Sequence, residues 1–243
     1  MFKPLKSRMS VEQSINLIWL SLGSVALVEF AAHAAPGAIV LDLQHGLWER
    51  GTLEAAIAVA GSSVPVIARC AENSPQAIAQ PLDAGAASVL VPLVETADDA
   101  RRAVAAGRYP PLGKRSAGGV RPLLAGVGAM LEADRHVAVG VLIETVRGVE
   151  NAAAIAAVPG VDYLFVGTGD LALSRGTGDP GVIARDGAHV LQAARQAGLP
   201  CGLFTQDAAG ARAALADGYR MAVSANDIDV VKQGFWAACR ALG

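Results

Sequence analysis

Two acidic residues, Glu144 and Asp170, occupy matching positions in two consecutive strand–helix units of the sequence. Glu144 follows the apolar run VGVLI (139–143), and Asp170 follows VDYLFVG (161–167); residues 146–160 have the pattern of one helix closed by Pro-Gly. A right-handed crossover brings the carboxyl ends of parallel strands to one edge of a sheet, so the two acids should share an opening. Neighbouring carboxylates need a cation, a shared proton or a basic side chain between them. A hard divalent metal is the interpretation we favour, and two unrelated loop acids are the alternative.

Further polar residues stand at the ends of the predicted strands. Asp42 and His45 follow the second strand, Arg69 ends the third, and Gly167-Thr168-Gly169 precedes Asp170. Asp83 closes the helix before the fourth strand, so its side chain would reach the others only from the opposite end of the sheet or through the core. Taken singly, a histidine or an arginine after a strand is as well explained by a structural contact. Their coincidence at one edge favours a catalytic site.

This set of side chains suits metal-assisted enolisation. Two carboxylates that hold a divalent ion leave coordination positions open for a chelating 2-oxo acid. The planar fork of Arg69 suits an oxyanion or a carboxylate. A histidine such as His45, oriented by Asp42 or Asp83, is suited to proton transfer at neutral pH. The backbone N–H groups of residues 167–169 provide a cradle for a substrate carboxylate.

Eight strand–helix units along the chain would have to position these residues. The expected strands are 16–23, 38–43, 64–70, 88–94, 139–143, 161–167, 201–205 and 221–225. Composition does not change between the halves, so a (β/α)₈ TIM barrel forming a single domain over residues 1–243 is the economical interpretation. A doubly wound open sheet is the second choice, but it would normally carry a Gly-rich fingerprint after the first strand, where only Gly23 occurs.

The segment from about 108 to 134 interrupts this alternation. It is rich in Gly and Pro and long enough for a functional loop or lid with a short helix at its end.

Composition narrows the function classes. Apolar residues make up 53% of the chain and charged residues 17%, which favours buried contacts in a homo-oligomer. A net charge of −2 with dispersed Lys and Arg gives no footprint for nucleic acid or an anionic membrane, so a small-molecule substrate is expected. The three cysteines have no disulfide or zinc spacing, and no apolar run long enough for a membrane span or signal core occurs. A cytoplasmic location is therefore expected.

Several ordered motifs resemble those of the HpcH/HpaI family, the class II pyruvate-dependent aldolases. LDLQHG (41–46) is similar to the family's D-x-E-H-G segment and VIAR (66–69) to its strand-end arginine. The family's other blocks are matched by residues 82–104, by RYPPLGKRS (108–116) and by IETVRGVENAAAIAAVPGVDYLFVGTGDL (143–171), and the likeness extends over residues 20–229. The resemblance implies a (β/α)₈ barrel, often a hexamer that exchanges its last helix between neighbours.

The resemblance also implies a catalytic scheme. Mg²⁺, Mn²⁺ or Co²⁺ would be held by Glu144 and Asp170, pyruvate would chelate the ion, and Arg69 would steady the enolate. His45, supported by Asp42 and Asp83, would transfer protons through water. The implied activity is cleavage or formation of 4-hydroxy-2-oxo acids through a pyruvate enolate.

Three departures from the family's motifs lie next to the predicted site. Gln44 stands where glutamate is usual, Leu142 where glutamine is common, and Thr168-Gly169 where proline is usual. The family also includes citrate-forming enzymes of siderophore biosynthesis that condense acetyl-CoA with oxaloacetate, and this is the second candidate function. A non-catalytic barrel that serves as a binding subunit is the third.

Overall fold

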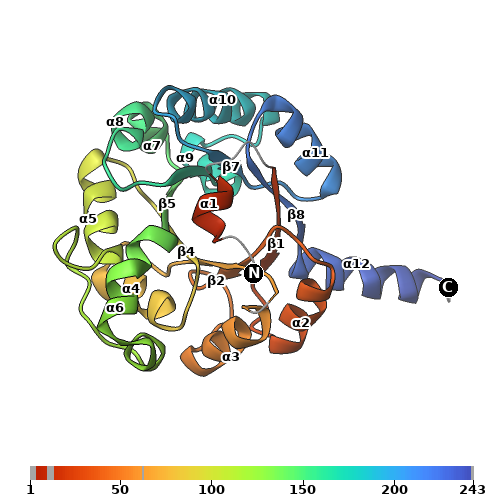
Figure 1. Cartoon of the computed structure of the whole chain (residues 1–243). Coiled ribbons are helices and arrows are strands. Elements are labelled where there is room, and N and C mark those ends of the chain that lie inside the picture. Colours follow the sequence, from red (N-terminus) through yellow and green to blue (C-terminus); the bar gives the residue numbers. More distant parts are fainter. Residues whose placement is uncertain (1–3, 10–13, 62, 242–243) are drawn as a thin grey trace.

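The computed structural model describes residues 4–9, 14–61 and 63–241 and contains a closed barrel of eight parallel strands (Figure 1). Each strand pairs in parallel with the next, and β8 pairs with β1. The strands are β1 Ile15–Leu20, β2 Ala38–Asp42, β3 Val66–Arg69, β4 Ser88–Val91, β5 Ala138–Ile143, β6 Tyr163–Val166, β7 Cys201–Leu203 and β8 Met221–Asn226. All eight expected strands and the barrel are confirmed.

Helices surround the barrel in the described part of the chain (Figure 1). The expected helix over 146–160 is divided at Asn151 into α7 and α8, and α9 and α10 both lie between β6 and β7. The helices outside the barrel are α2 Val25–His33, α3 Arg50–Ala60, α4 Pro75–Asp83, α5 Ala97–Gly107, α7 Val146–Glu150, α8 Ala152–Ala156, α9 Thr168–Arg175, α10 Pro180–Gln196 and α11 Ala208–Asp217.

The barrel interior is filled by large side chains that face glycines on neighbouring strands. A Cβ at position 202 of β7 would lie 2.2 Å from a ring carbon of Phe165 on β6, so only glycine leaves room for that ring. Trp19 of β1 packs against Phe165 with ring centroids 6.2 Å apart. This aromatic pair closes the interior below the carboxyl ends of the strands and prevents the barrel from forming an open channel.

The segment from 108 to 134, expected to be a functional loop or lid with a short helix at its end, does not cover the carboxyl ends of this chain's own strands. It contains α6 (Val120–His136), kinked at Gly126 where φ is 84°, and it contacts α1 and α4. Because the segment joins α5 to β5, it lies at the amino end of the barrel, where a connection from helix to strand must run. Arg121 accordingly donates to the carbonyl oxygens of Ala84 and Glu54.

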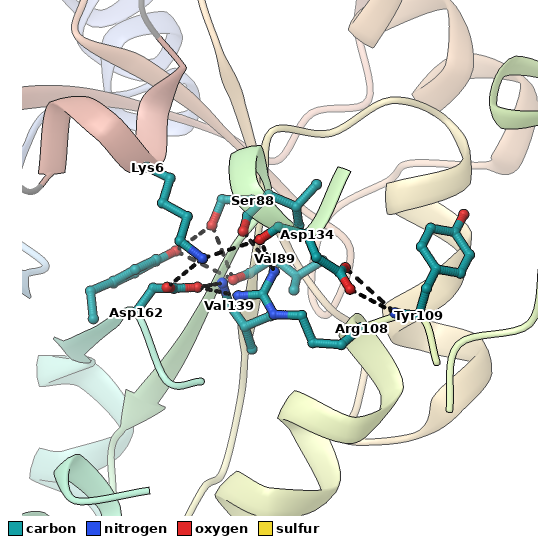
Figure 2. A network of polar contacts seen from close by, with 10 residues as sticks. Lys6, Ser88, Val89, Arg108, Tyr109, Asp134, Val139 and Asp162 are labelled. Atoms are coloured by element: carbon teal, nitrogen blue, oxygen red, sulfur yellow. Dashed lines mark hydrogen bonds and ion pairs between the residues drawn. The ribbon is translucent and has the colours of Figure 1, made fainter. Parts of the chain in front are cut away.

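A network of polar contacts fixes this amino end, as Figure 2 shows. Asp162, just before β6, accepts from Lys6 at 3.0 Å, from Arg108 at 2.5 Å and from the backbone N–H of Val139 at 2.7 Å (Figure 2). Lys6 belongs to α1 (Leu5–Met9), a short helix that the sequence did not predict. Its Leu5 is 1% exposed among side chains of the barrel interior, so α1 plugs this end.

The last helix, α12 (Asp227–Arg240), projects away from the body of the molecule (Figure 1). Its side chains Ile228, Val230, Phe235 and Trp236 are between 49% and 67% exposed. No helix among the described residues is long and apolar enough to cross a membrane.

Candidate active site

A cavity of about 510 Å³ opens at the carboxyl end of the barrel, and most of the predicted site residues line it. These are Asp42, His45, Arg69, Glu144, Gly167, Thr168, Gly169 and Asp170. A somewhat larger cavity of about 600 Å³ lies at the amino end beside Lys6 and Arg220, and none of the predicted site residues lines it. The cavity at the carboxyl end is therefore the candidate active site, because barrel enzymes carry their active sites at this end.

Glu144 and Asp170 line this cavity together, and the charge of Asp170 is near enough to raise the pKa of Glu144. Glu144 follows β5 and is 1% exposed, and its Oε1 accepts from the backbone N–H of Leu93 at 2.8 Å. A Cβ at position 167 would lie 2.9 Å from Oε2 of Glu144, so Gly167 leaves room for the carboxylate. Burial and the charge of Asp170 raise the pKa of Glu144 to about 7, against the hydrogen bond from Leu93. Two acids in this state would gain from a bound cation.

The raised pKa of Glu144 predicts a pH-dependent gain of stability in the metal-free Glu144→Gln protein. The folded state binds the proton more tightly than the unfolded state, so wild type loses stability as the pH rises from about 4.5 to about 7. A shift of this size corresponds to roughly 3 kcal/mol, and the glutamine removes it. Urea unfolding in chelator should therefore show the variant more stable than wild type at pH 8.5, with little difference at pH 4.5. The exposed Glu72→Gln is the control, and an equal effect at both pH values would contradict the prediction.

Asp42 and Arg69 form a buried ion pair at the ends of the adjacent strands β2 and β3. Nε of Arg69 donates to Oδ1 of Asp42 at 2.8 Å, and Nη2 donates to Oδ2. Burial alone would raise the pKa of Asp42, but the hydrogen bond and charge of Arg69 outweigh it and hold the pKa below its usual value. The guanidinium also lies 5.2 Å from the centre of the Trp19 ring. Within the described residues no group accepts from Nη1, which leaves this N–H₂ for a ligand in the cavity.

Asp42 does not orient the ring of His45, contrary to the sequence-based expectation. Among the described residues its carboxylate accepts from Arg69, from Nε1 of Trp19, from the hydroxyl of Ser21 at 3.4 Å and from the backbone N–H groups of Gln44 and His45, the last at 3.2 Å. Asp42 therefore fixes the turn after β2 that carries His45. The His45 side chain is exposed and lines the cavity.

Gly167, Thr168 and Gly169 form the start of α9, with Gly167 as its N-cap. The first N–H groups of a helix have no partner within the helix and attract anions. Thr168 is held in place by its hydroxyl, which donates to the carbonyl oxygen of Phe204 at 3.3 Å. The expected cradle for a carboxylate is thus next to Asp170, which lies in the first turn of the same helix.

Asp83 is the one predicted site residue that this arrangement leaves out. It ends α4 at the amino side of the barrel and forms an ion pair with Arg115 at 2.7 Å. Within one chain it does not reach His45, because a residue between a helix and the following strand lies at the opposite end of the barrel from the cavity.

Several residues that shape the site were not among the predicted ones. Trp19, near the end of β1, and Ser21, just after it, line the cavity, and the position of the first strand could have indicated them. Asp227, 5% exposed, accepts from the backbone N–H of Ser21 at 2.9 Å and so fixes the loop after β1. Leu93 has a φ of 53°, rare for a residue with a side chain, and no sequence signal indicates its N–H contact to Glu144.

The protein is thus a barrel that carries acidic side chains, an arginine and the N-terminus of a helix around one cavity. Comparison with known proteins shows the family to which it belongs. The sequence model of the HpcH/HpaI aldolase/citrate lyase family matches residues 16–233. The chain belongs to this family.

The named relatives within this family indicate which type of enzyme the chain is. A hydroxypyruvate/pyruvate aldolase of Paraburkholderia phytofirmans is 35% identical over 93% of this chain and 92% of its own. A 4-hydroxy-2-oxovalerate aldolase of Rhodococcus jostii is 38% identical over 77% and 75%. The solved structure of a citrate synthase, SbnG, is more distant at 25% identity, although it covers 98% of this chain and 97% of its own with a TM-score of 0.88. The chain is therefore a class II aldolase, a carbon–carbon lyase, and the citrate-forming alternative fits less well.

Proposed function

We propose that this aldolase cleaves and forms 4-hydroxy-2-oxo acids through the enolate of pyruvate, at the cavity defined by Arg69, Glu144 and Asp170. The observation that carries the proposal is the shared opening of two adjacent carboxylates and a buried arginine with a free N–H₂. Relatives named for pyruvate and for a 4-hydroxy-2-oxo acid support the same substrate class.

The residues present fit a divalent cation such as Mg²⁺, Mn²⁺ or Co²⁺. Glu144 and Asp170 offer hard carboxylate oxygens. Burial, and to a smaller extent the charge of Asp170, raise the pKa of Glu144, and a bound cation would offset both effects. No group of three or more His, Cys, Asp or Glu able to hold a metal occurs among the described residues. Two carboxylates alone leave most coordination positions to water and a chelating ligand. When bound, the ion supplies Lewis-acid polarisation of a 2-oxo group.

The chain's own side chains would bind and orient the 2-oxo acid. Nη1 of Arg69 donates to the oxygen on which enolate charge develops, and the pairing of Asp42 with Nε and Nη2 keeps the guanidinium plane fixed. The start of α9, at residues 167–169, receives the substrate carboxylate. His45, at the open side of the cavity, passes a proton through water to or from the 4-hydroxyl group.

Cleavage of a 4-hydroxy-2-oxo acid with and without a chelator tests this function. Release of pyruvate should require added Mg²⁺, Mn²⁺ or Co²⁺ and should stop on complete metal removal. Undiminished cleavage by the metal-free protein would contradict it. Release of free coenzyme A from acetyl-CoA plus oxaloacetate, with little aldol cleavage, would establish the citrate-forming alternative instead.

We also propose that the chain works as a homo-oligomer in which α12 packs on a neighbouring copy, as in the hexamers that the family resemblance implies. The exposed Phe235 and Trp236 on this projecting helix support the proposal. Light scattering should give the mass of an oligomer for wild type and for the control Val59→Lys, and a reduced mass for Phe235→Glu/Trp236→Glu. Wild type with the mass of one chain would exclude the assembly.

A cytoplasmic location belongs to the same proposal. Cys70, Cys201 and Cys239 are all unpaired thiols, as a reducing compartment would keep them.

A further inference from the structure

On the side of β1 and β6 to β8, several apolar side chains line the catalytic cavity, next to the polar side chains of Thr168, Gln206 and Asn226. Trp19 and Phe165 form part of the floor, and Phe204 meets Trp19 edge to face with ring centroids 5.3 Å apart. At the rim, Leu173 of α9 and Ile228 of α12 line the same cavity, although they are 79% and 49% exposed. Two exposed aliphatic side chains over an aromatic floor form a cleft that suits a hydrocarbon chain.

The arginine that lines the cavity already has partners for most of its donor groups. Of the described residues that line it, Arg69 is the one arginine or lysine, and two of its three nitrogens bind Asp42. Its remaining N–H₂ faces the developing enolate in the function proposed above. Asp229 is a fourth carboxylate that lines the cavity. It is paired with Lys232 at 2.6 Å, and Lys232 itself does not line the cavity.

A substrate carboxylate near Leu173 and Ile228 would therefore meet no lysine or arginine among the described lining residues. It would meet apolar side chains, acids and the uncharged amides of Gln206 and Asn226, and the amide of Asn226 already donates to Asp229. Leaving hydration without gaining a hydrogen-bonded partner is unfavourable for a charged group. A methyl or methylene group at the same place would instead be removed from water by Leu173, Ile228 and Phe204.

We infer that the aldehyde used by this enzyme is uncharged and carries an aliphatic chain, and that Leu173 and Ile228 determine this preference. The inference rests on the proposed function and specifies its second substrate. In the condensing direction, C3 of the pyruvate enolate forms a bond with the aldehyde carbon, whose C=O π bond breaks. The resulting alkoxide takes one proton, giving a 4-hydroxy-2-oxo acid with an alkyl group on C4. Cleavage reverses these steps, so no oxidant or further reactant is needed.

A matched pair of aldehydes tests the inference. Butanal and 4-oxobutanoate have the same number of carbons and differ in a terminal methyl against a terminal carboxylate. With pyruvate and saturating Mg²⁺, kcat/KM for butanal should exceed that for 4-oxobutanoate by about tenfold or more, as expected when one substrate loses a favourable pocket contact. Equal rates, or a preference for 4-oxobutanoate, would overturn the inference.

Two variants assign the preference to particular residues. Leu173→Lys and Ile228→Lys place an ammonium group at the rim, so each should raise kcat/KM for 4-oxobutanoate and lower it for butanal. The control Val59→Lys adds the same charge on α3, away from the cavity, and should leave the ratio unchanged. A ratio that moves equally in all three variants would show an effect of net charge and would contradict the assignment.

Exchange of the C3 protons of pyruvate with deuterated water, measured without any aldehyde, distinguishes failure of the aldehyde inference from failure of the proposed enolate function. Metal-dependent exchange together with a preference for 4-oxobutanoate would overturn the aldehyde inference and leave the enolate function standing. Absence of exchange at all would overturn the proposed function itself.

Discussion

The Asp170→Asn protein is expected to lose aldol cleavage by about three orders of magnitude in kcat/KM. The change keeps the size of the side chain and removes one of the two charges that would hold the cation beside Glu144. The Lewis-acid contribution of a metal is worth several kcal/mol, and each 1.4 kcal/mol corresponds to a factor of ten in rate. Steady-state assays at saturating Mg²⁺ measure the loss, and calorimetric titration measures metal binding in the same protein.

Asp179→Asn provides the matched control for this loss. Asp179 is the exposed N-cap of α10, where asparagine caps a helix equally well, so the same chemical change should leave both cleavage and metal binding intact. Metal binding and turnover of Asp170→Asn close to those of wild type would remove Asp170 from the site.

The second large effect is expected at Arg69, where stability and activity should separate. Arg69→Met leaves Asp42, 2% exposed, without its cation. Removing one partner of a buried ion pair costs about 3–5 kcal/mol. Loss of the donor to the enolate oxygen should lower kcat roughly 10²- to 10³-fold. Urea unfolding and steady-state kinetics measure the two effects.

The double variant Arg69→Met/Asp42→Asn tests whether this separation is real. The neutral pair no longer buries an unpaired charge, so most of the lost stability should return while activity stays low. Recovery of activity together with stability would show that Arg69 acts only by holding the fold.

The barrel could be predicted because its strands carry a strong local signal. The run VGVLI (139–143) is apolar throughout, as a parallel strand covered on both faces must be, and β5 is buried at every residue. The short α1 gave no comparable signal, since its five residues, LKSRM, include three polar ones and contact the barrel interior through Leu5 and Met9.

The segment over 108–134 shows where local composition misleads. Its glycines and prolines indicated a loop or lid with a short helix at its end, whereas the helix there, α6, has 17 residues, runs across Pro122 and Gly126 and contacts α1 and α4. The order of elements, which places every connection from helix to strand at the amino end, would have excluded a lid over the active site.

The sequence was sufficient to predict which residues share the cavity. It was not sufficient to predict which atoms each of them contacts. The positions of Arg69, Glu144 and Asp170 at or just after the ends of predicted strands were enough to predict that they share one cavity. The partner of Asp42 depends on the register of β2 and β3, which aligns it with Arg69 across the sheet, and the sequence does not state this register. The N–H of Leu93 reaches Glu144 through a left-handed backbone conformation that no residue type indicates.

Exchange of the C3 protons of pyruvate with deuterated water, followed by NMR, tests the central claim most directly, because it reports the enolate without a second substrate. The wild-type protein should catalyse exchange with Mg²⁺, Mn²⁺ or Co²⁺ and stop when the ion is chelated. Asp170→Asn and Arg69→Met/Asp42→Asn should be nearly inactive, and Asp179→Asn should match wild type. Exchange that continues unchanged in the chelated protein or in Asp170→Asn would contradict enolate formation at the Glu144 and Asp170 site.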